Sequence, residues 1–289
     1  MQTGGDDLES DDEYLDQNWG RDETVTAAVD ESISQDRGDK QTLSNKRGIT
    51  EITGDDDEDQ AVGISKKKKS NPKNLLLEAG RGIAKETPDV QAQFLWACYT
   101  NALKLRGEEV PEYKFGASHI KTSKIQEERE EPSKYDPSMS KFLKSGVLSS
   151  SKRLKKWKHN KCPMVLIICA SAKRAVSILK EISSLNVRAA KLFARHMSIS
   201  DQTAMLENNK YSIAVGTPNR LLKLTEENDS DEVPLSLDQT ELIVIDCHED
   251  AKRYTVCTMN DTAPDLMMFM KEAVVPQFKK RSNLKISFF

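Results

Sequence analysis

Two short stretches of the chain hold side chains that can bind a ligand or perform chemistry. The first is Leu242-Ile-Val-Ile-Asp-Cys-His-Glu-Asp250, an apolar run that ends in an acidic cluster. The second is Tyr211-Ser-Ile-Ala-Val-Gly-Thr-Pro-Asn-Arg220, an apolar run that leads into a threonine–proline pair. Thr217 and Pro218 predict a helix start, because threonine is a common N-cap and proline is favoured at the first helical position. The free N–H groups of a helix start suit a phosphate, while Asp246 offers a single carboxylate for weak metal binding.

Catalysis by a thiol or by a bound zinc ion has little support in the sequence. Cys247 and His248 are adjacent after a predicted strand, and adjacent residues on a strand point to opposite faces. Together with Glu249 and Cys257 they also lack the spacing of a zinc site. We therefore predict no metal and no cofactor.

Alternating strands and helices position these two stretches. Continuous apolar runs predict strands, and apolar residues spaced by three and four predict helices. The predicted strands are 164–169, 187–193, 213–215, 242–245 and 284–289; the predicted helices are 172–182, 199–206 with Ser200 as its cap, 219–224, and one that starts at Thr262 and runs through Val274. This order implies an α/β fold with a doubly wound, mostly parallel sheet and right-handed crossovers. Such sheets bind ligands at the carboxyl ends of their strands, where both stretches end.

The segment before the sheet is also predicted to be partly regular. Thr87 and Pro88 open a predicted helix that ends at Gly107, and residues 115–120 predict a short strand. The aromatic residues of that helix are expected to pack in the core rather than to stack on a ligand. Residues 127–131, rich in charge and followed by proline, predict a surface loop.

The charge of the chain is divided between an acidic start and a basic remainder. Residues 1–60 contain 19 Asp and Glu against 5 Lys and Arg, a net charge of −14, although the whole chain has a net charge of only −3. Few large apolar residues occur there, so residues 1–72 are predicted to be a disordered acidic tail, followed by a single lobe over residues 73–289. Lys66-Lys-Lys-Lys69 is a candidate nuclear localisation signal; a solvated, self-repelling tail is the alternative.

The most basic region is residues 141–200, with 14 Lys and Arg against the single acid Glu181. Its densest run is Lys152-Arg-Leu-Lys-Lys-Trp-Lys-His-Asn-Lys161. Lys152, Arg153, Lys155 and Lys156 could neutralise phosphates, and Trp157 could stack on a base. Contact with nucleic acid is favoured over a solvated helix face or a second nuclear signal.

Cysteine usage and hydropathy indicate the compartment. The five cysteines are odd in number and form no Cys-x-x-Cys pair, which favours a reducing compartment. No apolar run approaches the roughly 20 residues that span a bilayer, and the start of the sequence does not resemble a secretory signal. We expect a soluble intracellular protein with no membrane partner.

The motifs resemble a known family. Residues 215–220, Val-Gly-Thr-Pro-Asn-Arg, are similar to the Thr-Pro-Gly-Arg motif of the first RecA-like domain of DEAD-box RNA helicases, and residues 243–249 lie where the Val-Leu-Asp-Glu-Ala-Asp motif would be. Residues 169–175, Cys-Ala-Ser-Ala-Lys-Arg-Ala, take the place of Pro-Thr-Arg-Glu-Leu-Ala, although the helicase arginine falls on Ala172. Residues 171–175, 191–196 and 215–220 resemble more closely the Cms family of small-subunit pre-ribosome assembly factors, which are similar to a degenerate, single-lobed helicase domain. Leu192-Phe-Ala-Arg-His196 is the most specific match, because an ordinary helicase has a glycine pair there.

Against this resemblance, the residues of an ATPase are incomplete. The phosphate cradle Gly-x-x-x-x-Gly-Lys-Ser/Thr is not found in the sequence. Cys247 stands where a helicase has the glutamate that positions water, so Asp246 is expected to be a vestigial nucleotide or metal position. The Ser-Ala-Thr motif and second lobe of a helicase would come after Phe289, the last residue of the sequence. We therefore expect no enzyme activity.

The resemblance implies binding to RNA instead. Thr217, Asn219 and Arg220 at one helix start, and Lys173 and Arg174 at another, match residues that touch the RNA backbone in helicases. Arg195 and His196 replace the glycine pair and add charge, although His196 can equally be a packed or exposed histidine.

The implied function is that of a non-catalytic assembly factor of the small ribosomal subunit in the nucleus and nucleolus. Its expected partners are pre-ribosomal RNA or small nucleolar RNA and pre-ribosomal assembly proteins. Two alternatives stay open: a nucleotide-dependent helicase-like ATPase completed by a partner, and a module that binds only proteins.

Overall fold

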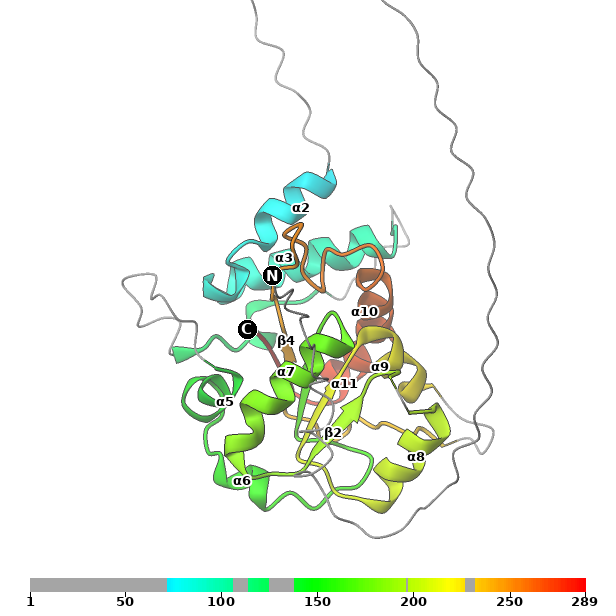
Figure 1. Cartoon of the computed structure of the whole chain (residues 1–289). Helices are drawn as coiled ribbons and strands as arrows, with labels where there is room; N and C mark the ends of the chain where they lie inside the picture. The colour runs from blue at the N-terminus through cyan, green and yellow to red at the C-terminus, as the bar shows by residue number, and fades with distance from the viewer. Residues whose placement is uncertain (1–71, 106–113, 125–137, 196, 227–231) are drawn as a thin grey trace, which may run out of the picture. The chain divides into compact units, whose positions relative to one another are not determined.

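The computed structural model describes residues 72–105, 114–124, 138–195, 197–226 and 232–289 (Figure 1). Several predictions concern residues outside these ranges. They are the disordered acidic tail, the localisation signal at Lys66–Lys69, the helix end at Gly107 and the surface loop at 127–131. The position of His196 lies outside them as well.

A five-stranded, fully parallel sheet is the centre of the fold, with strand order β2-β3-β1-β4-β5. The strands are β1 (Val165–Ile168), β2 (Ala189–Leu192), β3 (Ile213–Gly216), β4 (Leu242–Ile245) and β5 (Lys285–Phe288). The α/β prediction is confirmed, and each strand begins and ends within two residues of its predicted limits. The all-parallel sheet flanked by helices agrees with a RecA-like, doubly wound fold.

Helices connect the strands and cover both faces of the sheet (Figure 1). Those before the sheet are α2 (Pro72–Gly80), the 3₁₀ turn η1 (Ile83–Lys85), α3 (Pro88–Ala102), η3 (Ala117–His119), α5 (Met139–Lys141) with its π-helical continuation η4 (Phe142–Val147), and α6 (Lys152–Lys155). Those within and after it are α7 (Ala172–Ile182), η5 (Ser183–Leu185), α8 (Ile199–Asn208), α9 (Pro218–Thr225), α10 (Ala263–Phe269), the π-helical turn η6 (Met270–Val274) and α11 (Val275–Lys280). The helix starts predicted at Thr87 and Thr262 are confirmed, since both residues are N-caps.

Two local predictions are wrong. Ser198, not Ser200, caps α8, because its hydroxyl accepts the Asp201 N–H while the Asp201 carboxylate accepts the Ser198 N–H in a reciprocal capping box. The strand predicted at 115–120 is mostly the turn η3. Only Ile120 pairs with the sheet, through a parallel bridge to Ile286.

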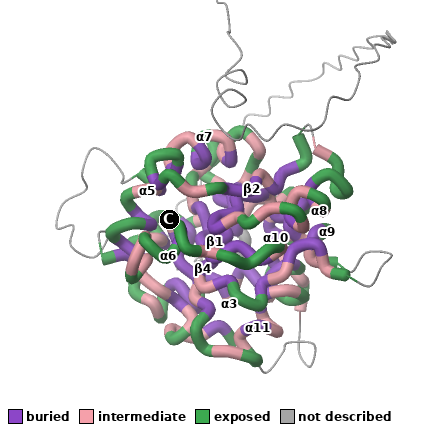
Figure 2. The backbone as a smooth tube through the Cα atoms, turned by 90° about the horizontal axis from the view of Figure 1, so that it is seen from below, coloured by how far each residue is buried: buried purple, intermediate pink, exposed green. Residues whose placement is uncertain are grey.

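Side chains of the sheet alternate between two apolar layers. Leu166 and Ile168 of β1 belong to a buried cluster with α3, α9 and α10. Because successive residues on a strand point to opposite faces, Val165 and Ile167 face the other layer, where α7 lies. All four residues of β1 are buried, and the tube of β1 is coloured accordingly in Figure 2, so a ligand can reach this strand only at its two ends.

Gly216, the last residue of β3, has no room for a side chain. A Cβ atom there would lie 2.7 Å from the Leu192 carbonyl oxygen and 2.7 Å from Leu221 Cδ2. Because this close approach lets the Thr217 N–H reach Leu192 O at 3.1 Å, Gly216→Ala would force β3 and β2 apart. We expect a loss of about 1–3 kcal/mol in the free energy of unfolding, measured in urea.

Gly116→Ala is the matched control for this prediction. A Cβ atom at Gly116 meets only Ser118 Oγ at 3.8 Å and His119 Nδ1 at 3.9 Å, which is ordinary contact. Equal losses for the two variants would contradict a steric role for Gly216.

Candidate functional site

A hollow of about 700 Å³ lies at the carboxyl edge of the sheet. Its walls come from the end of β4, the start of α7 and the η1 turn. The lining residues are Gly80, Gly82, Ile83, Ala84, Lys85, Ser138, Arg174, Glu181, Asp246, Cys247, His248, Glu249 and Phe289. The hollow thus contains the acidic cluster in which the sequence predicted a vestigial nucleotide or metal position.

Asp246 in this hollow already has a cation as its partner. Arg174 Nε donates to Asp246 Oδ2 at 2.8 Å, and Arg174 Nη2 donates to Oδ1 at 2.9 Å. The Asp246 side chain is 1% exposed, so this bidentate pair is largely shielded from water. Both carboxylate oxygens face the guanidinium, and the described part of the chain holds no cluster of three or more side chains able to bind a metal. The residues present therefore do not fit a metal ion.

Glu181 extends the pair into a network. Arg174 Nη1 lies 3.4 Å from Glu181 Oε1, and the other oxygen of Glu181 accepts the Met139 N–H at 2.7 Å. Burial disfavours the charged form of Arg174, but hydrogen bonds to Asp246 and attraction to both carboxylates outweigh it and raise the pKa of Arg174. The network connects α7 to the end of β4 and to α5, so it stabilises the packing of these three elements.

Cys247 shows no sign of activation as a nucleophile. Two effects raise the pKa of the Cys247 thiol: the hydrogen bond with Cys257, which is the larger, and burial of the sulfur. Burial likewise raises the pKa of Cys169, at the end of β1, to about 12. Both sulfurs are protonated thiols at neutral pH, whereas nucleophilic attack requires a thiolate.

Arg220 is also directed into the protein. Arg220 is only 8% exposed, and its Nη1 donates to Met197 O at 3.0 Å and to Gln202 Oε1 at 2.9 Å. Gln202 in turn donates to the carbonyl oxygens of Lys191 and Phe193 at 2.9 and 3.0 Å. Arg220 and Gln202 therefore hold both ends of the segment between β2 and α8, on which Arg195 lies.

The other predicted contacts at this edge are more accessible. Lys173 is exposed, and its side chain has no hydrogen bond or ion pair with any residue that the structure describes. Asn219 is exposed while donating to Asp265 Oδ2 at 3.0 Å, and this bond ties α9 to α10. Thr217 is half-buried and makes no side-chain capping bond. Arg195 is exposed, although it too has an interaction partner within the chain.

The basic run around α6 lies at the opposite edge of the sheet. Arg153 forms a bidentate ion pair with Glu241, the residue just before β4. Trp157 donates its indole N–H to Cys162 O at 2.7 Å, in the segment leading into β1. Lys152, Lys155 and Lys156 are exposed beside them. The structure therefore separates the predicted RNA contacts into two groups, one at each end of the strands.

Comparison with known proteins gives the family. A family model described as CMS1, U3-containing 90S pre-ribosomal complex subunit, matches residues 45–289. The chain belongs to this family. Protein CMSS1 of Xenopus laevis is 28% identical over 154 residues, which are 52% of this chain and 53% of that protein. Protein CMS1 of Chaetomium thermophilum is 33% identical over 128 residues, 43% of this chain and 48% of that protein.

Protein cms1 of Schizosaccharomyces pombe is 27% identical over 139 residues, or 47% of this chain and 48% of that protein. The matches thus span about half the length of each of these relatives. Membership in the CMS1 family supports a role in ribosome biogenesis, because the family description names a pre-ribosomal complex. In the part of the chain that the structure describes, no helix is long and apolar enough to span a membrane.

The sequence did not identify Glu181 and Gln202 as site residues. Glu181 is an internal partner of Arg174, and Gln202 is an internal partner of Arg220. A signal existed for Glu181, since it is the only acid among residues 141–200 and is therefore a natural partner for one of their cations. Gln202 had no comparable signal, because a polar residue in an amphipathic helix is usually exposed.

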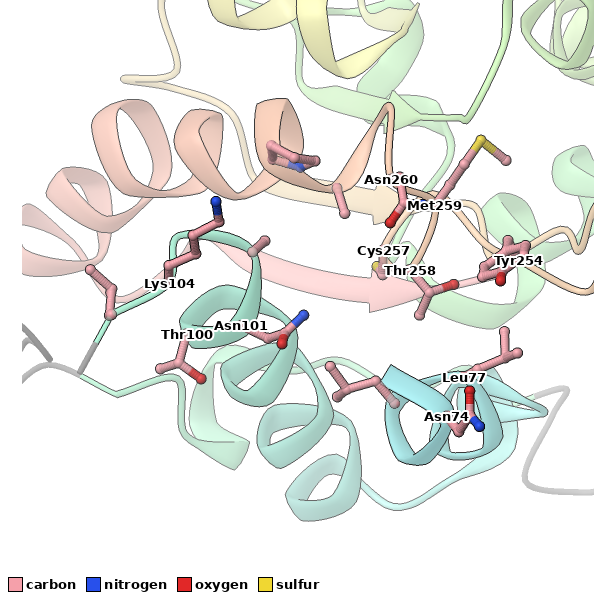
Figure 3. Close-up of a pocket in the computed structure, with 15 residues that line it drawn as sticks. Asn74, Leu77, Thr100, Asn101, Lys104, Tyr254, Cys257, Thr258, Met259 and Asn260 are labelled. Atoms are coloured by element: carbon pink, nitrogen blue, oxygen red, sulfur yellow. The ribbon is translucent and has the colours of Figure 1, made fainter. Parts of the chain in front are cut away.

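Figure 3 shows a second hollow, of about 590 Å³. It is lined by α2, the end of α3 and the 254–264 segment. Asn74, Asn101, Lys104 and Asn260 point polar groups toward it, and Leu77 and Met259 supply apolar surface (Figure 3). No acidic residue is among the fifteen that line it.

Proposed function

We propose that this CMS1-family chain is a non-catalytic subunit that binds RNA or ribonucleoprotein during assembly of the small ribosomal subunit in the nucleolus. The family description supports the assembly role, and the expected partners are pre-ribosomal or small nucleolar RNA and pre-ribosomal proteins. The observation on which the non-catalytic role rests is the pair formed by Arg174 and Asp246. Asp246, the carboxylate at the position where a helicase binds its metal–nucleotide complex, is already neutralised by a guanidinium held at 2.8 and 2.9 Å.

Nucleotide binding by the purified chain tests the non-catalytic role. We expect neither magnesium-dependent ATP binding by calorimetry nor ATP hydrolysis, with and without RNA. Magnesium-dependent binding that is lost in Asp246→Ala would instead favour the helicase-like ATPase completed by a partner. Binding that persists in Asp246→Ala would place the nucleotide at another site and would equally contradict this expectation.

Crosslinking of the full chain to RNA in cells, with mapping of the crosslinked residues, tests the RNA contact. We expect crosslinks within Lys152–Trp157 or near Lys173 and Arg195. Recovery of pre-ribosomal proteins without RNA would contradict the proposal and select the protein-binding module. Substitution of Arg220 or Arg174 is not suitable here, since both guanidinium groups hold the fold together.

The hollow of Figure 3 is the observation that favours the protein-binding alternative. Its carboxamide groups can each donate and accept a hydrogen bond, as the backbone of a bound peptide does. Under that alternative, Asn101→Ala with Asn260→Ala would remove pre-ribosomal proteins from the purified complex, while charge reversal of the exposed lysines would not.

A further inference from the structure

We propose that the main RNA-binding surface is the amino edge of the sheet, where the strands begin, and that it takes single-stranded RNA. This inference rests on the proposed function, that the chain binds RNA. It places the RNA at the end of the strands opposite to the edge that the helicase resemblance implies. We call this surface the amino-edge surface and define it by α6, residues 156–161, Lys210 and the end of α11.

Two contacts and one shared hollow connect these segments into a continuous surface. The ion pair of Arg153 with Glu241 fixes α6 beside the start of β4. Asn160 pairs with Lys210, just before β3, through an isolated bridge. On the other side, Arg153 lines a hollow of about 400 Å³ together with Asn283 and Lys285, which come after α11. From β5 to β3 the surface crosses three strand spacings of about 4.8 Å each, enough to contact several phosphates.

Seven exposed lysines of this surface have no hydrogen bond or ion pair from their side chains within the described part of the chain. They are Lys152, Lys155, Lys156, Lys158, Lys210, Lys279 and Lys280. By contrast, the acids around them are engaged in the protein. Glu241 binds Arg153, both Glu207 and Glu232 bind Lys161, and Asp238 accepts from Gln277.

Two exposed acids of this edge have no ion pair within the described part of the chain: Glu226, at the end of α9, and Asp238, whose partner Gln277 is an uncharged amide. Internal ion pairs therefore hold the amino-edge surface together and leave its lysines available to release counterions from bound RNA.

The carboxyl edge has a different balance of charge. Its exposed lysines without a partner among the described residues are Lys85, Lys173 and Lys252. Asp250 and Asp261 are exposed at the same edge, and Arg253 is paired with Glu249. A phosphate backbone approaching there meets both signs of charge, so this edge favours RNA less than the amino edge does.

Trp157 gives the amino-edge surface an aromatic group with a fixed orientation. Its N–H is bound to Cys162 O, and its ring centroid lies 4.7 Å from that of His159. Proteins that bind single strands without sequence preference combine cations that track the backbone with aromatic rings on which bases stack. Half-buried Trp157 among exposed lysines matches this combination.

Two matched charge reversals test the inference. One variant changes Lys155, Lys156 and Lys158 to Glu, and the other changes Lys85, Lys173 and Lys252 to Glu, so both lose the same amount of positive charge. Fluorescence anisotropy with a labelled single-stranded RNA of about 20 nucleotides measures affinity at several salt concentrations. Circular dichroism and thermal melting confirm that both variants fold.

We expect the amino-edge variant to bind about a hundredfold more weakly at 0.1 M salt, and the slope of log affinity against log salt to fall by about 2, since each lysine–phosphate contact on a single strand contributes about 0.7. The carboxyl-edge variant is expected to lose less than about fivefold. Trp157→Phe, which keeps an aromatic ring, should bind more tightly than Trp157→Ala.

Other outcomes overturn the inference in distinguishable ways. A larger loss in the carboxyl-edge variant would place the RNA at that edge and leave the proposed function standing. If both variants fold and bind RNA like the original chain, the contact lies elsewhere, and again only the inference fails. If the amino-edge variant keeps its RNA affinity but leaves pre-ribosomal particles, an acidic protein is the partner of this surface. No RNA binding by the unchanged chain would overturn the proposed RNA contact together with the inference.

Discussion

Replacement of Arg174 by alanine is expected to lower the free energy of unfolding by about 3–5 kcal/mol, the range seen when one partner of a buried ion pair is removed. The substitution leaves the Asp246 carboxylate, 1% exposed, without the two hydrogen bonds that now satisfy its oxygens. It also removes one contact of Glu181. Urea denaturation followed by tryptophan fluorescence measures the change.

Two controls separate this effect from a general effect of substitutions in α7. Lys173→Ala changes the neighbouring residue, whose side chain is exposed and has no bonded partner in the described ranges, and should alter stability by less than about 0.5 kcal/mol. The double variant Arg174→Ala with Asp246→Ala removes both charges and should recover a large part of the loss, because no buried charge is left unpaired. A cost below about 1 kcal/mol for Arg174→Ala alone would contradict the view that this pair holds the carboxyl edge together.

The order of strands and helices could be predicted because each strand is an apolar run of consecutive residues in the sequence. The run 242–245 is apolar without interruption, as expected of a parallel strand covered on both faces, and it became β4 with the predicted limits. Segment 115–120 is less regular, and its turn is set by local bonds such as the Gly116 N–H to His119 Nδ1, at 3.0 Å. Such a hydrogen bond cannot be predicted from the spacing of apolar residues.

The candidate site was harder to predict because its charges are paired across long stretches of chain. Arg174 and Asp246 are 72 positions apart, and only the parallel pairing of β1 with β4 brings the ends of these strands together. Residue type therefore identified Arg174 as a cation but not the acid that it neutralises. Whether Arg174 and Arg220 reach RNA remains a prediction, and their internal bonds oppose it.

The order of the basic motifs along the chain already separates them in space. Lys152–Trp157 comes before β1, whereas Lys173 comes after it. In a parallel sheet, the residues just before a strand and those just after it lie at opposite edges, so the two predicted groups of RNA contacts could not form one surface. The position of each motif relative to its strand thus decides which charges can act together.

Gln202→Ala is expected to cost about 2–3 kcal/mol and to loosen the segment between β2 and α8. The Gln202 side chain donates to the carbonyl oxygens of Lys191 and Phe193 and accepts from Arg220. Alanine at this fully buried position leaves two carbonyl groups and part of a guanidinium group without partners. One buried group without a partner costs about 1–3 kcal/mol, and water that enters the space left by the side chain offsets part of the sum. Burial already disfavours the charged form of Arg220 and lowers its pKa, so the loss of a hydrogen-bond acceptor destabilises this guanidinium group further.

Hydrogen exchange of backbone amides shows where that loss occurs. We expect faster exchange at Phe193, Ala194 and Arg195 in Gln202→Ala, with exchange in β1 and β4 little changed, because local opening there does not require the sheet to unfold. Thr203→Ala is the matched control on the same helix, since Thr203 only donates to Ile199 O within its own turn. If exchange rises evenly over the whole sheet, Gln202 contributes to global stability alone. If it rises only between β2 and α8, the hydrogen bonds of Gln202 to that segment and to Arg220 together position Arg195 at the carboxyl edge.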